Sequence, residues 1–393
     1  MTNPLPELLA HGTQLTGWLI DDAAPLWFVN GVDPESGGFV ERLDQTGAPI
    51  REPRRARVQP RQLYAFSMAA MLGWDGPVDA LLRRGLKAYL AHYQRPDGLF
   101  RTLADADGTP LDERMVVYDQ AFAILACATM QAVVGPDDAM TSLAHGILDR
   151  LSATMRHPVA GFEESSPRSL PLASNPHMHL FEAFIAWIER REHPRWREEA
   201  DAVAALAQAR FIDPHSGMLR EFFDGDWSPA AGTPGRIVEP GHQFEWAWLL
   251  LRWAELTGQP APPAALRLIE IGETLGVDPA RGVAMNALLD DGARHDAGAR
   301  LWPQTERLKA NCAAAMMTGE ARYWAKAAAA AESLNRYLDT PTSGLWRDKM
   351  TPDGAFVEEP APASSFYHIV AAIAELNRAA ARHGRVDAGG PAV

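Results

Sequence analysis

The chain has 393 residues, of which 47% are hydrophobic and 22% are charged, an ordinary composition for a folded protein with a large core. Its 37 basic and 50 acidic residues give a net charge of −13, so nucleic acid and anionic membrane surfaces are not expected as partners. The sequence has no run of about 18 apolar residues and no basic segment at its start, so neither a membrane span nor a signal peptide is predicted.

Amphipathic segments alternate along the chain with segments that are apolar nearly all round. The first kind carries its charges on one face and predicts helices with a solvated side, whereas the second predicts helices enclosed by others. Cys127 and Cys312 both fall in the second kind, and two buried thiols without a Cys/His cluster fit a cytoplasmic protein without zinc. The amphipathic segments span roughly 6–21, 78–93, 137–155, 194–211, 264–275 and 320–338. The apolar segments span roughly 62–72, 120–130, 180–189, 247–255, 307–317 and 369–381.

A glycine and a short hairpin-like segment follow each amphipathic helix. Asp-Gly pairs, such as Asp107-Gly108 and Asp353-Gly354, continue several of these segments and are strong hairpin signals. The unit of outer helix, hairpin and inner helix recurs six times, at intervals of roughly 60 residues. The glycines that mark the six hairpins are Gly38, Gly98, Gly161, Gly217, Gly282 and Gly344.

This repeat predicts an all-α fold, an (α/α)6 barrel of six inner and six outer helices with short β-hairpins at the active-site end. An open solenoid would leave the apolar inner faces uncovered and would need polar capping repeats, which the sequence lacks. We therefore expect one catalytic domain over residues 1–383 and a disordered tail over residues 384–393. The inner helices of such a barrel run parallel, so their N-termini and the hairpins gather at one end. That end would hold Arg61, Asp119, His179, His242, Glu306 and His368.

Three histidines in one ring of helix N-termini predict proton transfer at this end of the barrel. Because the positive end of a helix dipole disfavours imidazolium, His179, His242 and His368 are expected to be neutral near pH 7 and able to accept and return a proton. Arg61 is a fixed cation suited to an oxygen that gains negative charge, and the glutamates three residues after His179 and His242 could orient their rings. With rim aromatics such as Trp302, these groups suit proton abstraction α to the carbonyl of a sugar, without a metal or cofactor.

Other interpretations of the same residues stay open. The two His-x-x-Glu pairs, which end in Glu182 and Glu245, could bind a metal by analogy with helical-bundle sites. A glycoside hydrolase on the same barrel would use two carboxylates, such as Asp119 and Glu306. A sugar-binding protein would need no turnover at all.

Five stretches at the starts of the inner helices carry a family likeness. They are VQPRQLY (58–64), NPHMHLFEA (175–183), PGHQFEW (240–246), LWPQTE (301–306) and SSFYH (364–368). Together they resemble the N-acylglucosamine 2-epimerase superfamily, which also holds mannose isomerases, sulfoquinovose-type aldose–ketose isomerases and cellobiose 2-epimerases. The resemblance covers nearly the whole chain, from residue 15 to residue 383.

The resemblance implies the same barrel, with metal-free and cofactor-free chemistry on an open-chain sugar through a cis-enediol(ate). It implies that His242 and His368 are the two acid/base groups, on opposite sides of C2, and that Arg61 lies near O1 and O2. It also implies that His179 helps to bind the sugar or open its ring, and that Glu245 pairs with His242. The other residues for which the resemblance implies substrate binding are Asn175, Glu182, Trp302, Gln304 and Glu306.

The motifs leave the sugar and the reaction outcome partly open. The QPRQ, PGHQFEW and WPQTE versions look most like mannose isomerase-type members, which implies a monosaccharide substrate and interconversion of D-mannose and D-fructose. The alternatives are a 2-epimerase of unsubstituted aldoses (mannose/glucose or cellobiose) and an N-acylglucosamine 2-epimerase. Which histidine serves C1 and which serves C2 also stays open, and the resemblance allows a monomer or a homodimer.

Overall fold

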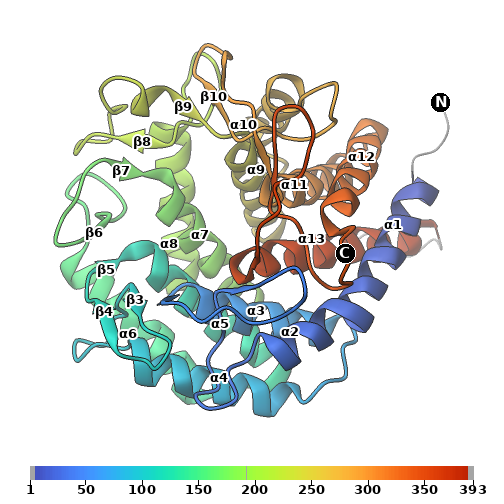
Figure 1. The fold of residues 1–393 in the computed structure, drawn as a ribbon. Coiled ribbons are helices and arrows are strands. Elements are labelled where there is room, and N and C mark those ends of the chain that lie inside the picture. Colours follow the sequence, from blue (N-terminus) through green and yellow to red (C-terminus); the bar gives the residue numbers. More distant parts are fainter. Residues whose placement is uncertain (1–4, 192, 388–393) are drawn as a thin grey trace.

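The inner helices form a closed ring (Figure 1). The structure, a computed structural model, describes residues 5–191 and 193–387. Within these residues each inner helix packs against the next, and the last packs against the first. The predicted (α/α)6 barrel is thereby confirmed. The inner helices are α3 (Val58–Met71), α5 (Val117–Val134), α7 (Ser174–Glu189), α9 (Pro240–Leu256), α11 (Trp302–Thr318) and α13 (Ala363–Asp387).

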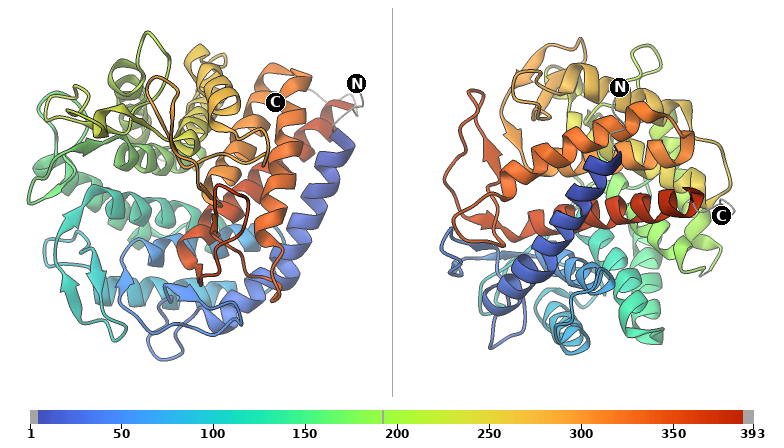
Figure 2. Two further views of the ribbon diagram at one scale, coloured as in Figure 1. Left: turned by 45° about the horizontal axis from the view of Figure 1, so that its top comes forward. Right: turned by 90° about the vertical axis from the view of Figure 1, so that its right-hand side faces the viewer.

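The outer helices cover this ring and match the predicted amphipathic segments. They are α1 (Leu5–Gly17), α4 (Val78–Tyr93), α6 (Asp138–Thr154), α8 (Arg195–Leu206), α10 (Pro263–Ile271) and α12 (Ala321–Leu338). One boundary differs from the sequence prediction of an end near residue 21, because a π turn (Trp18–Ala23) carries the first helix into α2 (Ala24–Asn30). Pro25 is tolerated there because it lies in the first turn of α2. Figure 2 shows α1 lying across α12 and α13, so the N-terminal helix covers the junction between the first and last units.

Short strand pairs form a ring at the ends where the inner helices begin (Figure 1). The strand before each inner helix pairs antiparallel with a strand of the following hairpin, and β14 pairs with β1 to close the ring. The predicted hairpins therefore lie at the predicted end of the barrel. The pairs are β2 (Arg54–Arg55) with β3 (Leu103–Ala104), β5 (Met115–Val116) with β6 (Ser165–Ser166), β7 (Leu172–Ala173) with β8 (Phe222–Phe223), β9 (Ile237–Val238) with β10 (Ala287–Leu289), β12 (Ala299–Arg300) with β13 (Lys349–Met350), and β14 (Ala361–Pro362) with β1 (Arg42–Leu43). Two further strands, β4 (Pro110–Asp112) and β11 (Arg294–Asp296), pair with β3 and β10.

A buried glutamine fastens a hairpin to the start of an inner helix, an arrangement that we call the glutamine clamp. Gln59 Oε1 accepts the N–H of Phe39 at 2.8 Å, and Gln59 Nε2 donates to the carbonyl of the same residue at 2.9 Å. Gln304 holds the N–H and carbonyl of Ala284 at 2.8 and 2.9 Å, and its Nε2 also donates to the carbonyl of Arg300 at 2.9 Å. Equivalent clamps are made by Gln120 and Gln243, while His177 accepts the N–H of Phe162 in the third unit. Because backbone groups occupy its oxygen and both amide hydrogens, the predicted contact of Gln304 with substrate is wrong.

Two further sequence predictions concern α5 and the C-terminus. In the described part of the chain α5 is the one helix long and apolar enough to cross a membrane, but its 18-residue window is 78% buried inside the barrel, as is usual for a core helix. The predicted tail begins four residues too early, since α13 continues to Asp387. The rest of that tail lies outside the described residues. Cys127 and Cys312 are buried free thiols, as expected.

Candidate active site

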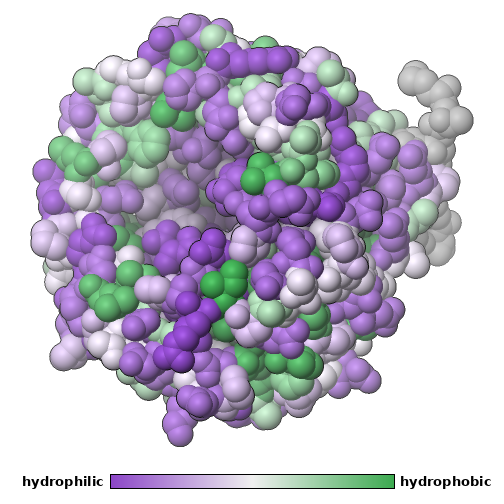
Figure 3. Space-filling view, viewed as in Figure 1, coloured by the Kyte–Doolittle hydropathy of each residue, from purple (hydrophilic) through white to green (hydrophobic). Residues whose placement is uncertain are grey.

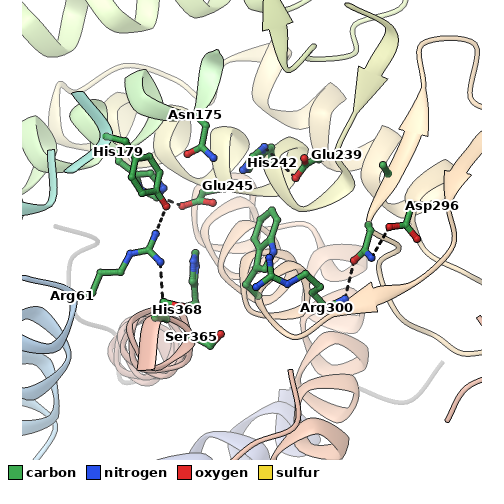
Figure 4. Close-up of a pocket in the computed structure, with 15 residues that line it drawn as sticks. Arg61, Asn175, His179, Glu239, His242, Glu245, Asp296, Arg300, Ser365 and His368 are labelled. Carbon is green, nitrogen blue, oxygen red and sulfur yellow. Dashed lines mark hydrogen bonds and ion pairs between the residues drawn. The ribbon is translucent and has the colours of Figure 1, made fainter. Parts of the chain in front are cut away.

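A cavity of about 390 Å³ lies where the inner helices begin, beneath the strand ring. Figure 3 shows a hollow in this face of the molecule, and Figure 4 shows the side chains around the cavity. The cavity is lined by Arg61, Tyr118, Asn175, His179, Glu239, His242, Glu245, Asn286, Ala287, Asp296, Arg300, Trp302, Ser364, Ser365 and His368. Each of the inner helices α3 to α13 contributes, which is why residues so far apart in sequence meet here.

Seven of the ten residues predicted for the site line this cavity. They are Arg61, Asn175, His179, His242, Glu245, Trp302 and His368. Two others, Glu182 and Glu306, lie behind the lining and hold the Nδ1 atoms of His179 and His368. The tenth, Gln304, belongs to the clamp of the fifth hairpin.

His242 is held by carboxylates that the sequence prediction did not assign to it. Its Nδ1–H donates to Glu221 Oε2 at 2.8 Å, and Glu239 Oε2 lies 3.6 Å from the same nitrogen (Figure 4 draws Glu239). Burial favours the neutral ring, but the two carboxylates outweigh it and raise the pKa of His242 to about 10. The direction of this shift favours an imidazolium at neutral pH, opposite to the neutral ring that the helix dipole alone predicts. The predicted partner Glu245 instead has its Oε1 3.9 Å from Nδ1 of His179.

His368 has the opposite protonation state. Burial, together with the positive charges of Arg61 and Lys309, holds its pKa well below the ordinary value for histidine. Its Nδ1–H donates to Glu306 Oε1 at 2.8 Å, and Glu306 Oε2 forms an ion pair with Lys309 Nζ at 2.7 Å. The proton on Nδ1 leaves the lone pair of Nε2 available on the cavity side, so His368 can act as a base. Both histidines lie close to one indole, since the ring of Trp302 lies 4.9 Å from that of His242 and 5.7 Å from that of His368.

His179 is the third histidine of the site and is also neutral. Burial lowers its pKa to about 4, although Glu182 opposes the shift. Its Nδ1 lies 3.3 Å from Glu182 Oε2, and Tyr367 donates its hydroxyl hydrogen to the same oxygen. The predicted orientation of His179 by Glu182 agrees with this geometry.

Arg61 is anchored at the cavity wall. It donates to the hydroxyl of Tyr118 and, at 3.4 Å, to the carbonyl of Ser364, so its guanidinium keeps a fixed position. Asp119 follows Tyr118 in the first turn of α5, but its side chain does not line the cavity and forms an ion pair with Arg57 at 3.0 Å. Asp119 and Glu306 are both fully buried and neither lines the cavity, so the hydrolase interpretation loses its two carboxylates.

Glu221 is the most informative residue that sequence reasoning missed. It stands two residues after Leu219, whose backbone is held by a glutamine clamp. The equivalent residues of the next two units also face the site, since Asn286 lines the cavity and Asp348 Oδ1 accepts a hydrogen bond from Ser365 at 2.7 Å. The register of the repeat could therefore have identified Glu221, because polar residues recur at this position.

Imidazole and carboxylate groups in the site are close enough together to consider a metal ion. Three sets of such atoms lie within 4.8 Å of one another among the described residues. In each set the imidazole Nδ1 is already bonded to a carboxylate, and Glu306 also has the ammonium of Lys309 beside it. These donors satisfy one another, and the absence of a metal from the reaction stays a prediction.

Comparisons with known proteins agree with this site. The family model described as N-acylglucosamine 2-epimerase (GlcNAc 2-epimerase) matches residues 37–372. A protein of Rhizobium meliloti (strain 1021) named mannose-6-phosphate isomerase is 52% identical over 370 residues, which cover 92% of this chain and 96% of that protein. A D-mannose isomerase of Thermobifida fusca is 27% identical over 375 residues, which cover 85% of this chain and 87% of that protein. The solved structure of cellobiose 2-epimerase from Spirochaeta thermophila DSM 6192 superimposes with a TM-score of 0.84 at 25% identity, covering 96% of this chain and 98% of that one. The chain therefore belongs to the N-acylglucosamine 2-epimerase family, and it is a sugar isomerase or epimerase.

Proposed function

We propose that the protein interconverts D-mannose and D-fructose through a cis-enediol(ate), with His368 as general base and His242 as general acid. The observation that carries this proposal is the opposite direction of the pKa shifts of two cavity histidines whose rings lie 4.9 and 5.7 Å from that of Trp302. Acid and base roles are assigned in this way wherever the environments of two titratable groups push their pKa values apart.

In the proposed reaction every proton is accounted for. Nε2 of His368 takes the proton from C2 of the open-chain aldose, while the imidazolium of His242 protonates the carbonyl oxygen O1, which gives the enediol. His242 then removes the proton from O2 and His368 returns its proton to C1, so the ketose forms and both rings recover their starting states. Arg61 stabilises the charge that develops on the oxygens during these steps. If His242 instead kept its proton while C2 was deprotonated, with Arg61 stabilising the enediolate, and then delivered that proton to the other face of C2, the product would be the 2-epimer; His368 would then have to return its proton to His242 through solvent before the next turnover.

Further residues support sugar binding at the same site. His179, neutral and oriented by Glu182, can exchange a proton with the ring oxygen or anomeric hydroxyl and so assist ring opening. Burial holds the pKa of Glu245 well above its ordinary value, so its carboxyl group is neutral and can donate a hydrogen bond to a sugar hydroxyl. The side chain of Asn175 and the face of Trp302 supply a polar and an apolar surface of the kind that a hexose requires.

A phosphorylated hexose is the second candidate substrate, because the relative that is 52% identical is named mannose-6-phosphate isomerase. The charges at the cavity favour the neutral sugar. Arg300 is the cation at the outer wall of the cavity, and its Nε and Nη2 are already paired with Oδ2 of Asp348, each at 3.1 Å. Asp296 lines the same region, and its carboxylate would repel a phosphate dianion, whereas burial raises the pKa of Glu239 beside it to about 7 and reduces its charge.

One nuclear magnetic resonance experiment tests the proposal. Purified protein is incubated with EDTA and D-mannose in D2O, and in parallel with D-mannose 6-phosphate, while deuterium at C1 and C2 and the identity of the product are followed. We expect fructose from D-mannose, with much slower turnover of the phosphate. Glucose as the product would establish a 2-epimerase instead, and loss of activity in EDTA would contradict the metal-free mechanism.

The matched variants separate catalysis from folding. His242→Asn and His368→Asn should each reduce kcat by about 100-fold or more, the usual scale for a general acid or base. His215→Asn, a change at an exposed histidine on a hairpin outside the cavity, should leave turnover unchanged. Near-normal rates in either cavity variant would overturn the assignment of roles.

A further inference from the structure

Lys309 lies one helical turn after Glu306 on α11 and is fully buried with it. Its ammonium is held between the carboxylate of Glu306 at 2.7 Å and the face of Trp248, whose ring centroid lies 3.6 Å away. Lys309 does not line the cavity, so it does not touch a bound sugar. A buried ammonium is costly unless it is paired, which indicates that this pair has a role in the site.

The ion pair governs which nitrogen of His368 carries a proton. An ionised Glu306 can only accept hydrogen bonds, so its Oε1 forces Nδ1 of His368 to be the donor. Without a cation at Oε2, a carboxyl group buried this deeply would take up a proton. A protonated Glu306 could donate to Nδ1, and the ring proton would then move to Nε2, where the reaction requires a lone pair.

We propose that Lys309 is a positioning residue, which pairs with Oε2 of Glu306, leaves Oε1 to accept the proton of Nδ1 and thereby fixes His368 in the Nδ1–H tautomer that makes Nε2 the base. This inference rests on the proposed function for its kinetic consequences, but not for the tautomer itself. The charged or titratable groups that surround His368 are Arg61 on α3, His179 and Glu182 on α7, Glu245 on α9, Glu306 and Lys309 on α11, and the neighbouring Tyr367 on α13. Within this set Lys309 is the cation in contact with Glu306.

The design compares three variants, because removing one member of a buried pair can prevent folding. In Glu306→Gln the ammonium still attracts the side-chain oxygen, which turns the amide NH2 toward His368 and forces the Nε2–H tautomer. In Lys309→Met the carboxyl group loses its cation and becomes protonated, with the same result. In the double variant Lys309→Met/Glu306→Gln the amide oxygen is released and can again accept the proton of Nδ1. We therefore expect each single variant to lose about 100-fold in kcat with little change in KM, and the double variant to recover at least about tenfold over Glu306→Gln.

The tautomer is measured directly from ¹⁵N resonances of labelled histidine, with His368 assigned by its loss in His368→Asn. We expect the Nδ1–H form in the wild type and in the double variant, and the Nε2–H form in either single variant that folds. The Nε2–H form in the wild type would overturn the proposal without any variant. So would a double variant no more active than Glu306→Gln, or a Lys309→Met variant that keeps both tautomer and kcat. If the tautomers follow expectation while the wild type isomerises no sugar, the proposed function fails and the role of Lys309 stands.

Discussion

Glu221 offers the sharpest test of the acid assigned at His242. Two unit charges about 4 Å apart in an effective dielectric of about 20 attract by roughly 4 kcal/mol, which corresponds to about 3 pKa units. In Glu221→Gln the charge is lost, but the amide oxygen can still accept from Nδ1–H and Glu239 remains 3.6 Å away. We therefore expect the pKa of His242 to fall from about 10 by about 1 to 3 units.

The assay is the pH dependence of kcat/KM for mannose isomerisation. Because the acid must be protonated, activity in the wild type should persist until the pH rises through about 10. In Glu221→Gln the alkaline limb should move down, so that activity at pH 9 falls about 2-fold for a shift of about 1 unit and about 100-fold for a shift of about 3 units, relative to its value at pH 6. Glu113→Gln is the control, since Glu113 is exposed, pairs with Arg101 and does not line the cavity. An alkaline limb that stays in place in Glu221→Gln would refute the reasoning.

Three further outcomes follow from the contacts described. Gln304→Leu should lower the free energy of unfolding by about 2–4 kcal/mol, because it leaves buried backbone groups of a hairpin without partners. The same change should leave KM nearly unchanged. Urea titration measures the first effect and steady-state kinetics the second. Asp119→Asn should retain isomerase activity within about tenfold but should lower the melting temperature, since Arg57 loses its partner. A loss of activity comparable to that of the histidine variants would show that Asp119 takes part in catalysis. The raised pKa of His242 should stabilise the fold fully below its ordinary value of 6.5 and progressively less as the pH rises through about 10. Urea midpoints at pH 6 and pH 10 measure this loss, and a midpoint that rises with pH would contradict it.

The repeat made the fold and the histidines predictable, whereas pairings between units were not. His242 and His368 could be placed because each lies in the first two turns of an inner helix, where the repeat brings polar residues to one end of the barrel. The repeat also marks the positions of Glu221 and Glu306, but it does not show which ring each carboxylate reaches, since Glu306 meets His368 across 62 positions and Glu221 meets His242 across 21. Helix spacing favoured Glu245 as the partner of His242, but the hairpin brings a carboxylate closer.

The sequence also led to a different expectation for the protonation of His242 and for the role of Gln304, and the reasons are related. A helix dipole supplies a fraction of a charge, whereas two carboxylates beside one ring outweigh it, and only the folded chain shows that they are there. Gln304 has a side chain that can bind sugar hydroxyls, and it lies in the first turn of an inner helix, where sugar-binding residues are expected. In the fold, however, its oxygen and both of its amide hydrogens bond to backbone groups around the hairpin, and the sequence does not show that these groups need a partner.

The pairing of β14 with β1 sets the order of events during synthesis of the chain. Arg61 donates to the carbonyl of Ser364, 303 residues later, and β1 must wait for a strand that leaves the ribosome almost last. At about 5–20 residues per second the gap is on the order of 15–60 s. During that interval the nascent chain carries five units whose apolar inner faces have no sixth unit to complete the ring. A chaperone would have its greatest opportunity to bind in this window, and catalytic activity would begin only after the sixth unit has closed the ring.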